Sequence, residues 1–328
     1  MPLSYADKQE ARQKSVFETY AKCVLFDYSY KFFYADGYGK ESLILNMKAE
    51  DYDNAENLQK YFIACLLSFY QQQYLFAKNQ SKLTAYNLAK PLWIFVGNKV
   101  NTDDSDILEV VSLLAFFLAA EYRSQVLTWL EEFVEDKTAL LDNKGNAIFK
   151  HRFHYLRDWQ GNMEGLYADI LRKLFNAESA QKLQLNQIKK ASGEIALSVG
   201  NHQPFGVINV GDSASLIKEA DKYPNLLFAT DEFTPSLFND INQKESTVNL
   251  LIGSRKFTEG WSSWRVSTMG LLNMGKGEGS QIIQLFGRGV RLKGENFSLK
   301  RTVTAYRNRF LMRKSISTRI RLMRHYSP

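Results

Sequence analysis

Two arginines near the end of the chain have the residue type and spacing to bind phosphate. Arg288 and Arg291 lie three residues apart, and Gln284 and Gly287 precede them. If this segment is helical, residues three apart lie on one face and point the same way. A guanidinium presents a planar fork of donors that can hold two phosphate oxygens at once. The pair therefore predicts a clamp for phosphoryl transfer, whereas an isolated pair of this kind favours a solvated helix face.

A strand and a loop with distinctive residues precede this segment. Residues 248–252 are apolar and predict a buried strand, and the loop after it contains Glu259 and Gly260 followed by a tryptophan. Residues 265–272 predict another strand, which a glycine-rich turn joins to the helix with the arginines. The order strand, loop, strand, turn, helix is typical of an α/β protein.

Together these patterns resemble motifs V and VI of superfamily 2 helicases. Within them, the segment is most similar to the Res subunit of type III restriction enzymes and to related phage-defence helicases. The Glu-Gly-Trp of motif V and the Gln-x-x-Gly-Arg-x-x-Arg of motif VI occur in the right order and at the right spacing. The family often has Asp after the Trp, where this chain has Ser262. The resemblance covers most of residues 20–300 and is patchy between about 120 and 200.

The resemblance implies an α/β fold of the RecA-like, P-loop NTPase type. This would be the second helicase domain, with a parallel sheet, a helical insertion and a helical N-terminal segment. In the family, ATP and Mg²⁺ lie between two RecA-like domains, and the second domain presents motif VI across the cleft. By that match, Arg288 and Arg291 would stabilise the charge of the transferred phosphate, and Gln284 would hold the phosphate or couple the domains.

The same match assigns further residues. Glu259 and Gly260 would link the nucleotide cleft to the nucleic-acid track, and Gly287 would lie on the nucleotide side. Three polar residues at or near strand ends would contact the phosphate backbone of the nucleic acid. The alternative is that they are ordinary loop residues without such a contact. These backbone-contact candidates are Ser254, Arg255 and Thr268.

The chain lacks the phosphate-binding loop G-x-x-x-x-G-K-[ST] that such a motor needs. Gly39 and Lys40 are followed by Glu41, which favours a turn instead. Asp231 and Glu232 end an apolar run, but they lie too late in the chain for the acidic box, so we interpret them as an ordinary strand end. We therefore expect ATP and Mg²⁺ to be bound mainly by a first RecA-like domain that these residues do not include, and we predict no metal-ligating residue.

Composition allows a sizeable core. The chain has 328 residues, of which 45% are hydrophobic and 13% aromatic, enough for one large domain or two small ones. We expect residues 1–85 to form the end of the first RecA-like domain with bridging helices, and 86–300 the second RecA-like domain with an insertion at about 120–200. Residues 301–328 would form a basic tail.

The positive charge is concentrated at the end of the chain. Residues 300–328 contain nine Lys or Arg and no acid. Removing these nine from the 42 basic residues leaves 33 against 35 acidic residues, a net charge of −2. The overall charge of +7 therefore does not indicate nucleic-acid binding by the rest of the chain. Two interpretations of the tail remain open, a basic arm for phosphate backbones and a truncated end.

Cysteine use and hydropathy indicate a cytoplasmic protein. Cys23 and Cys65 form neither a disulfide framework nor a metal pattern, which suits a reducing compartment. The longest apolar run, residues 110–120, is too short to span a bilayer, so we expect no membrane partner.

Periodicity and turn signals predict the remaining elements. Strands are expected in two short runs within 22–46, from 91, after 205 and at 225–230. Helices are expected at 6–22, 55–78, 105–120, 121–135, 159–175, 213–220 and 235–241.

These observations favour the C-terminal motor portion of an ATP-dependent DNA helicase or translocase. Its partners would be DNA, the first RecA-like domain and, as in the family, a methyltransferase subunit. Two other interpretations remain open, a RecA-like module that binds nucleic acid or a partner without hydrolysing ATP, and an inactive gene fragment. Loss of Arg288 should abolish ATPase activity in an assembled motor and leave a pure binding module unaffected.

Overall fold

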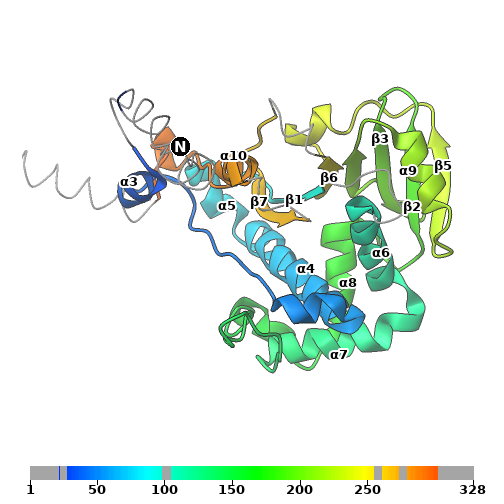
Figure 1. The fold of residues 1–328 in the computed structure, drawn as a ribbon, viewed down its shortest axis with the longest axis horizontal. Helices are drawn as coiled ribbons and strands as arrows, with labels where there is room; N and C mark the ends of the chain where they lie inside the picture. Colours follow the sequence, from blue (N-terminus) through cyan, green and yellow to red (C-terminus); the bar gives the residue numbers. More distant parts are fainter. Residues whose placement is uncertain (1–21, 23–27, 98–104, 255–260, 273–278, 302–328) are drawn as a thin grey trace, which may run out of the picture. The chain divides into compact units, whose positions relative to one another are not determined.

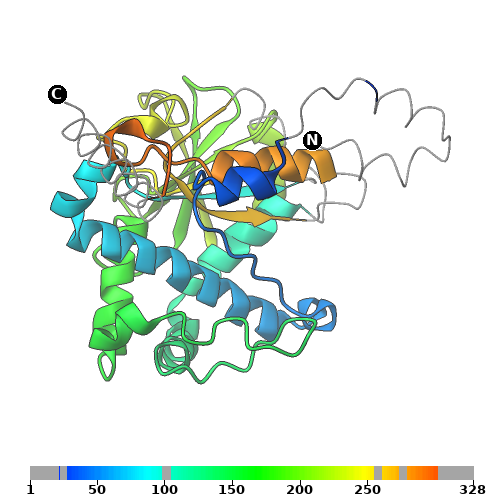
Figure 2. The same cartoon turned by 90° about the vertical axis from the view of Figure 1, so that its left-hand side faces the viewer.

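A computed structural model shows the fold (Figures 1 and 2) and describes Lys22 and residues 28–97, 105–254, 261–272 and 279–301. The chain divides into two compact units. The larger unit contains Leu43–Gln80 and Ala89–Gly275. The smaller unit contains Met1–Ser42, Ser81–Leu88 and Lys276–Pro328.

The larger unit is built on a seven-stranded sheet in the order β5-β2-β3-β4-β6-β1-β7. All of these strands run in one direction except β3, which is antiparallel to both of its neighbours. The α/β class is therefore confirmed, with a mostly parallel sheet. The strands are β1 (Leu92–Gly97), β2 (Leu183–Ile188), β3 (Glu194–Val199), β4 (Gly206–Asn209), β5 (Leu226–Asp231), β6 (Leu250–Ser254) and β7 (Val266–Leu271).

Burial explains why β1 and β6 read as nearly continuous apolar runs. Every residue of β1 is buried, and so is every residue of β3. In β6 only the last residue, Ser254, is partly exposed. Strands covered on both faces lose the alternation of apolar and polar residues that marks a half-exposed strand. The edge strand β5 keeps several exposed positions.

Helices pack against the sheet and against each other. Helices α4 (Ala55–Lys78), α6 (Asp106–Leu118) and α8 (Met163–Phe175) lie along the sheet, and α7 (Arg123–Val134) packs against all three (Figure 1). Helix α9 (Ser213–Ala220) packs against β2. Short 3-10 helices occur at η1 (Ala49–Asp53), η3 (Ala120–Tyr122), η4 (His154–Trp159) and η5 (Asn239–Asn242).

Side-chain caps mark the start of several of these helices. The side chain of Asn54 accepts from the backbone N–H of Asn57 at the start of α4. Ser105 caps α6 in the same way, and Asn162 caps α8. Each cap satisfies a backbone donor that the helix itself leaves unpaired, which is worth about 1 kcal/mol.

Several sequence predictions are confirmed. The helices predicted at 55–78 and 213–220 have these bounds in α4 and α9, and the strands predicted from 91, after 205 and at 225–230 appear as β1, β4 and β5. Asp231 ends β5 as an ordinary strand end. Its carboxylate accepts from the backbone N–H groups of Phe233 and Thr234 and from the Thr234 hydroxyl. The helix predicted at 6–22 lies outside the described residues, apart from Lys22.

The insertion expected at about 120–200 is not wholly helical. It contributes α7 and α8, but it also contributes β2 and β3, which hydrogen-bond within the main sheet. Gly193 allows the connection between these two strands, because it has φ +83° and a Cβ there would lie 2.1 Å from the Val210 carbonyl oxygen. The segment is therefore part of the sheet unit.

The helix predicted at 235–241 is also wrong, because only η5 forms there. Glu194 is buried and accepts from the Ser236 hydroxyl and from the backbone N–H of Phe238. At the start of the same loop, the Asp231 carboxylate accepts from the backbone N–H groups of Phe233 and Thr234. These side-chain acceptors hold the loop in turns and compete with helical hydrogen bonds.

The described part of the smaller unit consists of helices joined by loops and turns. Its described elements are α3 (Tyr30–Ala35), most of α5 (Gln80–Leu83), η2 (Thr84–Tyr86), α10 (Gly279–Gly289) and η8 (Glu295–Phe297). The two strands predicted within 22–46 are wrong for the described residues, because Tyr30–Ala35 is helical. Tyr30, Phe33 and Tyr34 have helical spacing, and the Tyr30 ring packs near the rings of the other two.

Within the described ranges, no helix combines the length and the apolar character needed to cross a bilayer.

Candidate functional site

One candidate region is the edge of the sheet where the parallel strands end. Gly97 of β1 is the Cα partner of Ser254 of β6, and Val96 is the partner of Leu271 of β7. The carboxyl ends of these neighbouring strands therefore lie at one edge, where open α/β sheets commonly bind ligands. The predicted residue Ser254 lies at this edge. Arg255, Glu259 and Gly260, which follow it in the chain, lie outside the described residues.

Thr268 lies within β7 rather than at its end. It is half-buried, and its hydroxyl accepts from the side-chain amide of Gln72 on α4 at 3.1 Å. The contact directs this hydroxyl to the face of the sheet that α4 covers. Thr268 and Ser254 belong to the same unit, but they do not share the strand-end position.

Arg265 holds the starts of three strands, a role that the sequence reasoning missed. Its guanidinium donates to the carbonyl oxygens of Lys90 at 3.0 Å and Val248 at 2.6 Å, and to that of Ile241. These contacts join the segments entering β1, β6 and β7. Arg265 is only 5% exposed, and burial lowers its pKa to about 10. Among the described residues no carboxylate pairs with it.

Two further buried polar side chains are Gln73 of α4 and Asn249, which immediately precedes β6. The Asn249 amide donates to the carbonyl oxygens of Lys173 and Leu174 at the end of α8, at 3.1 and 2.9 Å. Gln73 on α4 donates to the Pro91 carbonyl at 2.8 Å and contacts the Asn249 amide oxygen at 3.4 Å. These bonds fix α4 and α8 against the sheet.

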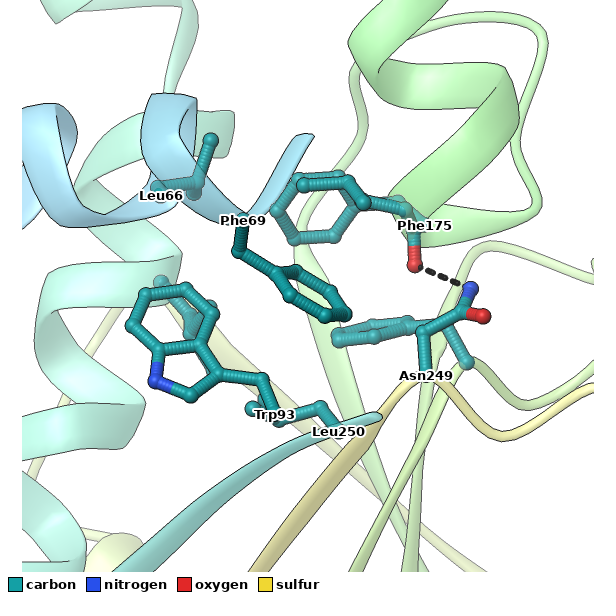
Figure 3. Close-up of a pocket in the computed structure, with 9 residues that line it drawn as sticks. Leu66, Phe69, Trp93, Phe175, Asn249 and Leu250 are labelled. Atoms are coloured by element: carbon teal, nitrogen blue, oxygen red, sulfur yellow. Dashed lines mark hydrogen bonds between the residues drawn. The ribbon is translucent and has the colours of Figure 1, made fainter. Parts of the chain in front are cut away.

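Figure 3 shows the small cavity beside Asn249, with the bond to Leu174 drawn as a dashed line. Its volume is about 10 Å³, close to the minimum for one water molecule. The other lining side chains are apolar and the Asn249 amide already has partners, so the cavity suits neither a substrate nor a water. The lining residues are Leu66, Phe69, Trp93, Leu114, Leu174, Phe175, Phe205, Asn249 and Leu250.

A larger hollow lies on the polar face of β2 and β3. Its volume is about 670 Å³, and Gln184, Asn186 and Ser198 form a hydrogen-bonded row along it. Asp231 and Glu232 also line it, whereas none of its described lining residues is Lys or Arg. A phosphate group there would meet carboxylates without a compensating cation. The hollow is therefore unsuited to nucleotide phosphates.

The predicted phosphate clamp belongs to the smaller unit. Gln284 and Arg288 are four residues apart in α10, so they lie on the same helix face. Arg288 is in the last turn, but α10 ends at Gly289 and Arg291 follows the helix. The prediction that both arginines lie on one helix face is therefore wrong.

The arginines nevertheless lie close enough to interact. Burial lowers the pKa of Arg288, and the positive charge of Arg291 lowers it further. Gln284 and Arg291 are exposed, and Arg288 is half-buried. A Cβ added at Gly287 would meet no atom within 4 Å, so packing within the described chain does not require glycine there. Arg288 thus lies in the last turn of α10 and Arg291 just after the helix, and the charge of Arg291 reaches the Arg288 guanidinium.

Comparison with protein-family models, curated proteins and solved structures found no match to this chain.

Proposed function

We propose that this chain supplies the second RecA-like domain of an ATP-dependent motor that moves on DNA. In this proposal Arg288 and Arg291 contact the triphosphate of an ATP held by a first RecA-like domain. The observation that carries the proposal is the placement of Arg288 in the last turn of α10 and of Arg291 just after the helix, within a sequence motif of the helicase type. The charge of Arg291 lowers the pKa of Arg288, so the two guanidiniums repel each other. A phosphate anion bound to both would offset this repulsion, because it attracts each of them.

The chemistry required of such a pair is electrostatic. Phosphoryl transfer needs positioned cations that stabilise charge on the transferred phosphate in the transition state, and little covalent chemistry. Arginine suits this task because its charge persists when it is partly buried and its planar fork matches phosphate oxygens. Gln284, one helical turn before Arg288, would hold a phosphate oxygen or the attacking water.

The magnesium ion is assigned to the first domain. Among the described residues, no group of three or more His, Cys, Asp or Glu side chains is arranged to hold a metal. Mg²⁺ in nucleotide sites is commonly held by one or two carboxylates together with the phosphates. The residues here fit the phosphate end of ATP·Mg²⁺, whereas the metal's protein ligands would come from the partner domain.

The nucleic-acid side of the proposal rests on the strand ends of the larger unit. Ser254 lies at the carboxyl edge of the parallel strands, and its hydroxyl is of a type that contacts phosphate backbones. Arg255 would add a charge-assisted contact by the motif match. Thr268 is a weaker candidate for such a contact because its hydroxyl bonds Gln72.

A module that binds DNA or a partner without hydrolysing ATP is the second candidate function. The 328 residues contain no phosphate-binding loop, so this candidate needs no ATP bound by these residues. Sequencing the DNA that flanks this reading frame separates the two. A phosphate-binding loop and an acidic box encoded in the adjoining frame, with ATPase activity in the joined protein, would support the motor. A flanking region without them would favour the binding module.

A further inference from the structure

Arg291 lies beyond the last turn of α10, so something other than the helix must fix its position. The carbonyl oxygen of the preceding residue, Val290, accepts from the backbone N–H of Lys40 at 2.7 Å. The Val290 side chain is buried, and its own N–H donates to Phe286. The peptide group that leads into Arg291 is thus held by a segment about 250 residues earlier in the chain.

The turn that carries Lys40 is itself tightly constrained. Gly39 is buried with φ +76°, and a Cβ there would lie 2.8 Å from the Phe33 ring and 3.5 Å from the Val290 carbonyl oxygen. Phe33 in turn stacks on Tyr38, with ring centroids 5.4 Å apart. Only glycine permits both this backbone conformation and this close approach.

Arg301 closes the turn from the other side. Its guanidinium donates to the carbonyl oxygens of Tyr34 at 2.6 Å, Tyr38 at 2.9 Å and Gly39 at 3.1 Å. It also lies over the Tyr34 ring, 3.8 Å from the centroid, and its backbone N–H donates to the Gly37 carbonyl at 2.8 Å. One side chain thus holds three carbonyl groups of the segment that ends in the Lys40 N–H.

We propose that Arg301 is a positioning residue for the arginine pair. It fixes the turn at Gly39, the turn presents the Lys40 N–H to Val290, and Val290 sets the direction in which Arg291 leaves α10. The inference rests on the proposed function, because a pre-set Arg291 matters only if it binds phosphate. Preorganised cations bind a phosphate without the entropic cost of ordering them first.

The test uses the full chain and inorganic tripolyphosphate as the probe. We expect Arg291→Ala to weaken tripolyphosphate binding about tenfold, as for loss of a charged hydrogen bond. Arg301→Lys keeps the charge but loses the planar fork and the ring contact, and we expect it to weaken binding about fivefold. In the Arg291→Ala background, Arg301→Lys should have no further effect, because it acts through Arg291.

Hydrogen exchange supplies a readout of the intermediate link. The Lys40 N–H donates to the Val290 carbonyl oxygen, and Arg301 holds the turn that places this N–H. Exchange at the Lys40 amide should therefore become faster in Arg301→Lys. Gly39→Ala should produce the same faster exchange and weaker binding. Its matched control is Gly161→Ala, which has a similar φ of +78° but no atom within 4 Å of the added Cβ. Arg157→Lys, an exposed arginine of the larger unit, controls for charge-conserving replacement.

The inference is overturned if Arg301→Lys leaves the exchange of the Lys40 amide unchanged. It is also overturned if Arg301→Lys weakens binding equally with and without Arg291, or does not weaken it at all. These outcomes leave the proposed function standing as long as Arg291→Ala itself weakens binding. If Arg291→Ala has no effect on tripolyphosphate binding, the inference is overturned, whereas the proposed function is tested separately by ATP hydrolysis in the assembled motor.

Discussion

Lys90 and Arg265 meet where β1 and β7 begin. The Nε–H of Arg265 donates to the Lys90 carbonyl oxygen at 3.0 Å. Burial lowers the pKa of the Lys90 ammonium to about 8, and the Arg265 charge contributes to the shift. The larger unit therefore holds two cations, Lys90 and Arg265, at the amino ends of its strands. Ser254 lies at the opposite, carboxyl ends.

Replacing Lys90 with Met should stabilise the larger unit at pH 7. In the unfolded chain the lysine pKa is 10.5, and folding lowers it to about 8. Below pH 8 both states are protonated, so the folded state carries the full penalty of a charged, partly buried lysine. Between pH 8 and 10.5 the unfolded chain binds more protons, so stability rises with pH. Lys90→Met should gain about 2 kcal/mol at pH 7, allowing for partial solvent screening.

The measurement is urea unfolding of the wild type and Lys90→Met from pH 7 to pH 11. The difference between the two proteins should be largest at pH 7 and should vanish near pH 10.5. A difference that is constant over this range would contradict the assignment, because it would reflect side-chain packing rather than titration.

Asn249 should be one of the more costly polar positions to truncate. In Asn249→Ala the carbonyl groups of Lys173 and Leu174 and the Gln73 amide lose a partner inside the core. Leaving buried polar groups unpaired costs about 3 kcal/mol in total. The control is Asn201→Ala, an exposed position, which should change the free energy of unfolding by less than about 0.5 kcal/mol. Equal effects of the two substitutions in urea unfolding would refute the role of Asn249.

Gly193→Ala should disrupt the connection between β2 and β3. The added Cβ would lie 2.1 Å from the Val210 carbonyl oxygen, and φ is +83°. We expect a loss of about 3 kcal/mol or more in the free energy of unfolding, from overlap and backbone strain together. Gly145→Ala has a similar φ of +78° but no atom within 4 Å of the added Cβ, so it should lose only about 1 kcal/mol. Thermal denaturation of both variants measures the difference in their stability loss. An equal loss in the two variants would contradict the prediction, because it would mean that the contact with the Val210 carbonyl costs nothing.

Local pattern predicted the elements whose own residues determine them. Helix α4 has an unbroken apolar face and an Asn cap, and β1 is a short apolar run bounded by Pro and Gly, so each carries its signal in its own sequence. A helix was wrongly predicted at 235–241 because Glu194, about 40 residues earlier in the chain, accepts from Ser236 and Phe238 through tertiary contacts that local pattern does not show. Pairing of β2 with β5 and β3 was likewise not predictable from spacing alone.

The candidate site was predictable in type but not in placement. The residue types around Arg288 indicated a phosphate clamp, whereas the end of α10 at Gly289 placed Arg291 outside the helix. The contact that holds the intervening Val290 comes from Lys40, far away in sequence. Arg265 was missed because a buried arginine bound by carbonyl oxygens has no local sequence signature.

The most direct test of the central claim is ATP hydrolysis by the chain assembled with a first RecA-like domain that carries a phosphate-binding loop. We expect Arg288→Ala to lower the rate at saturating ATP about 1,000-fold, and to change ATP affinity much less, because the arginine acts on the transition state. Arg157→Ala, at an exposed site of the larger unit, should leave the rate unchanged. An Arg288→Ala protein that hydrolyses ATP at the wild-type rate would contradict the account.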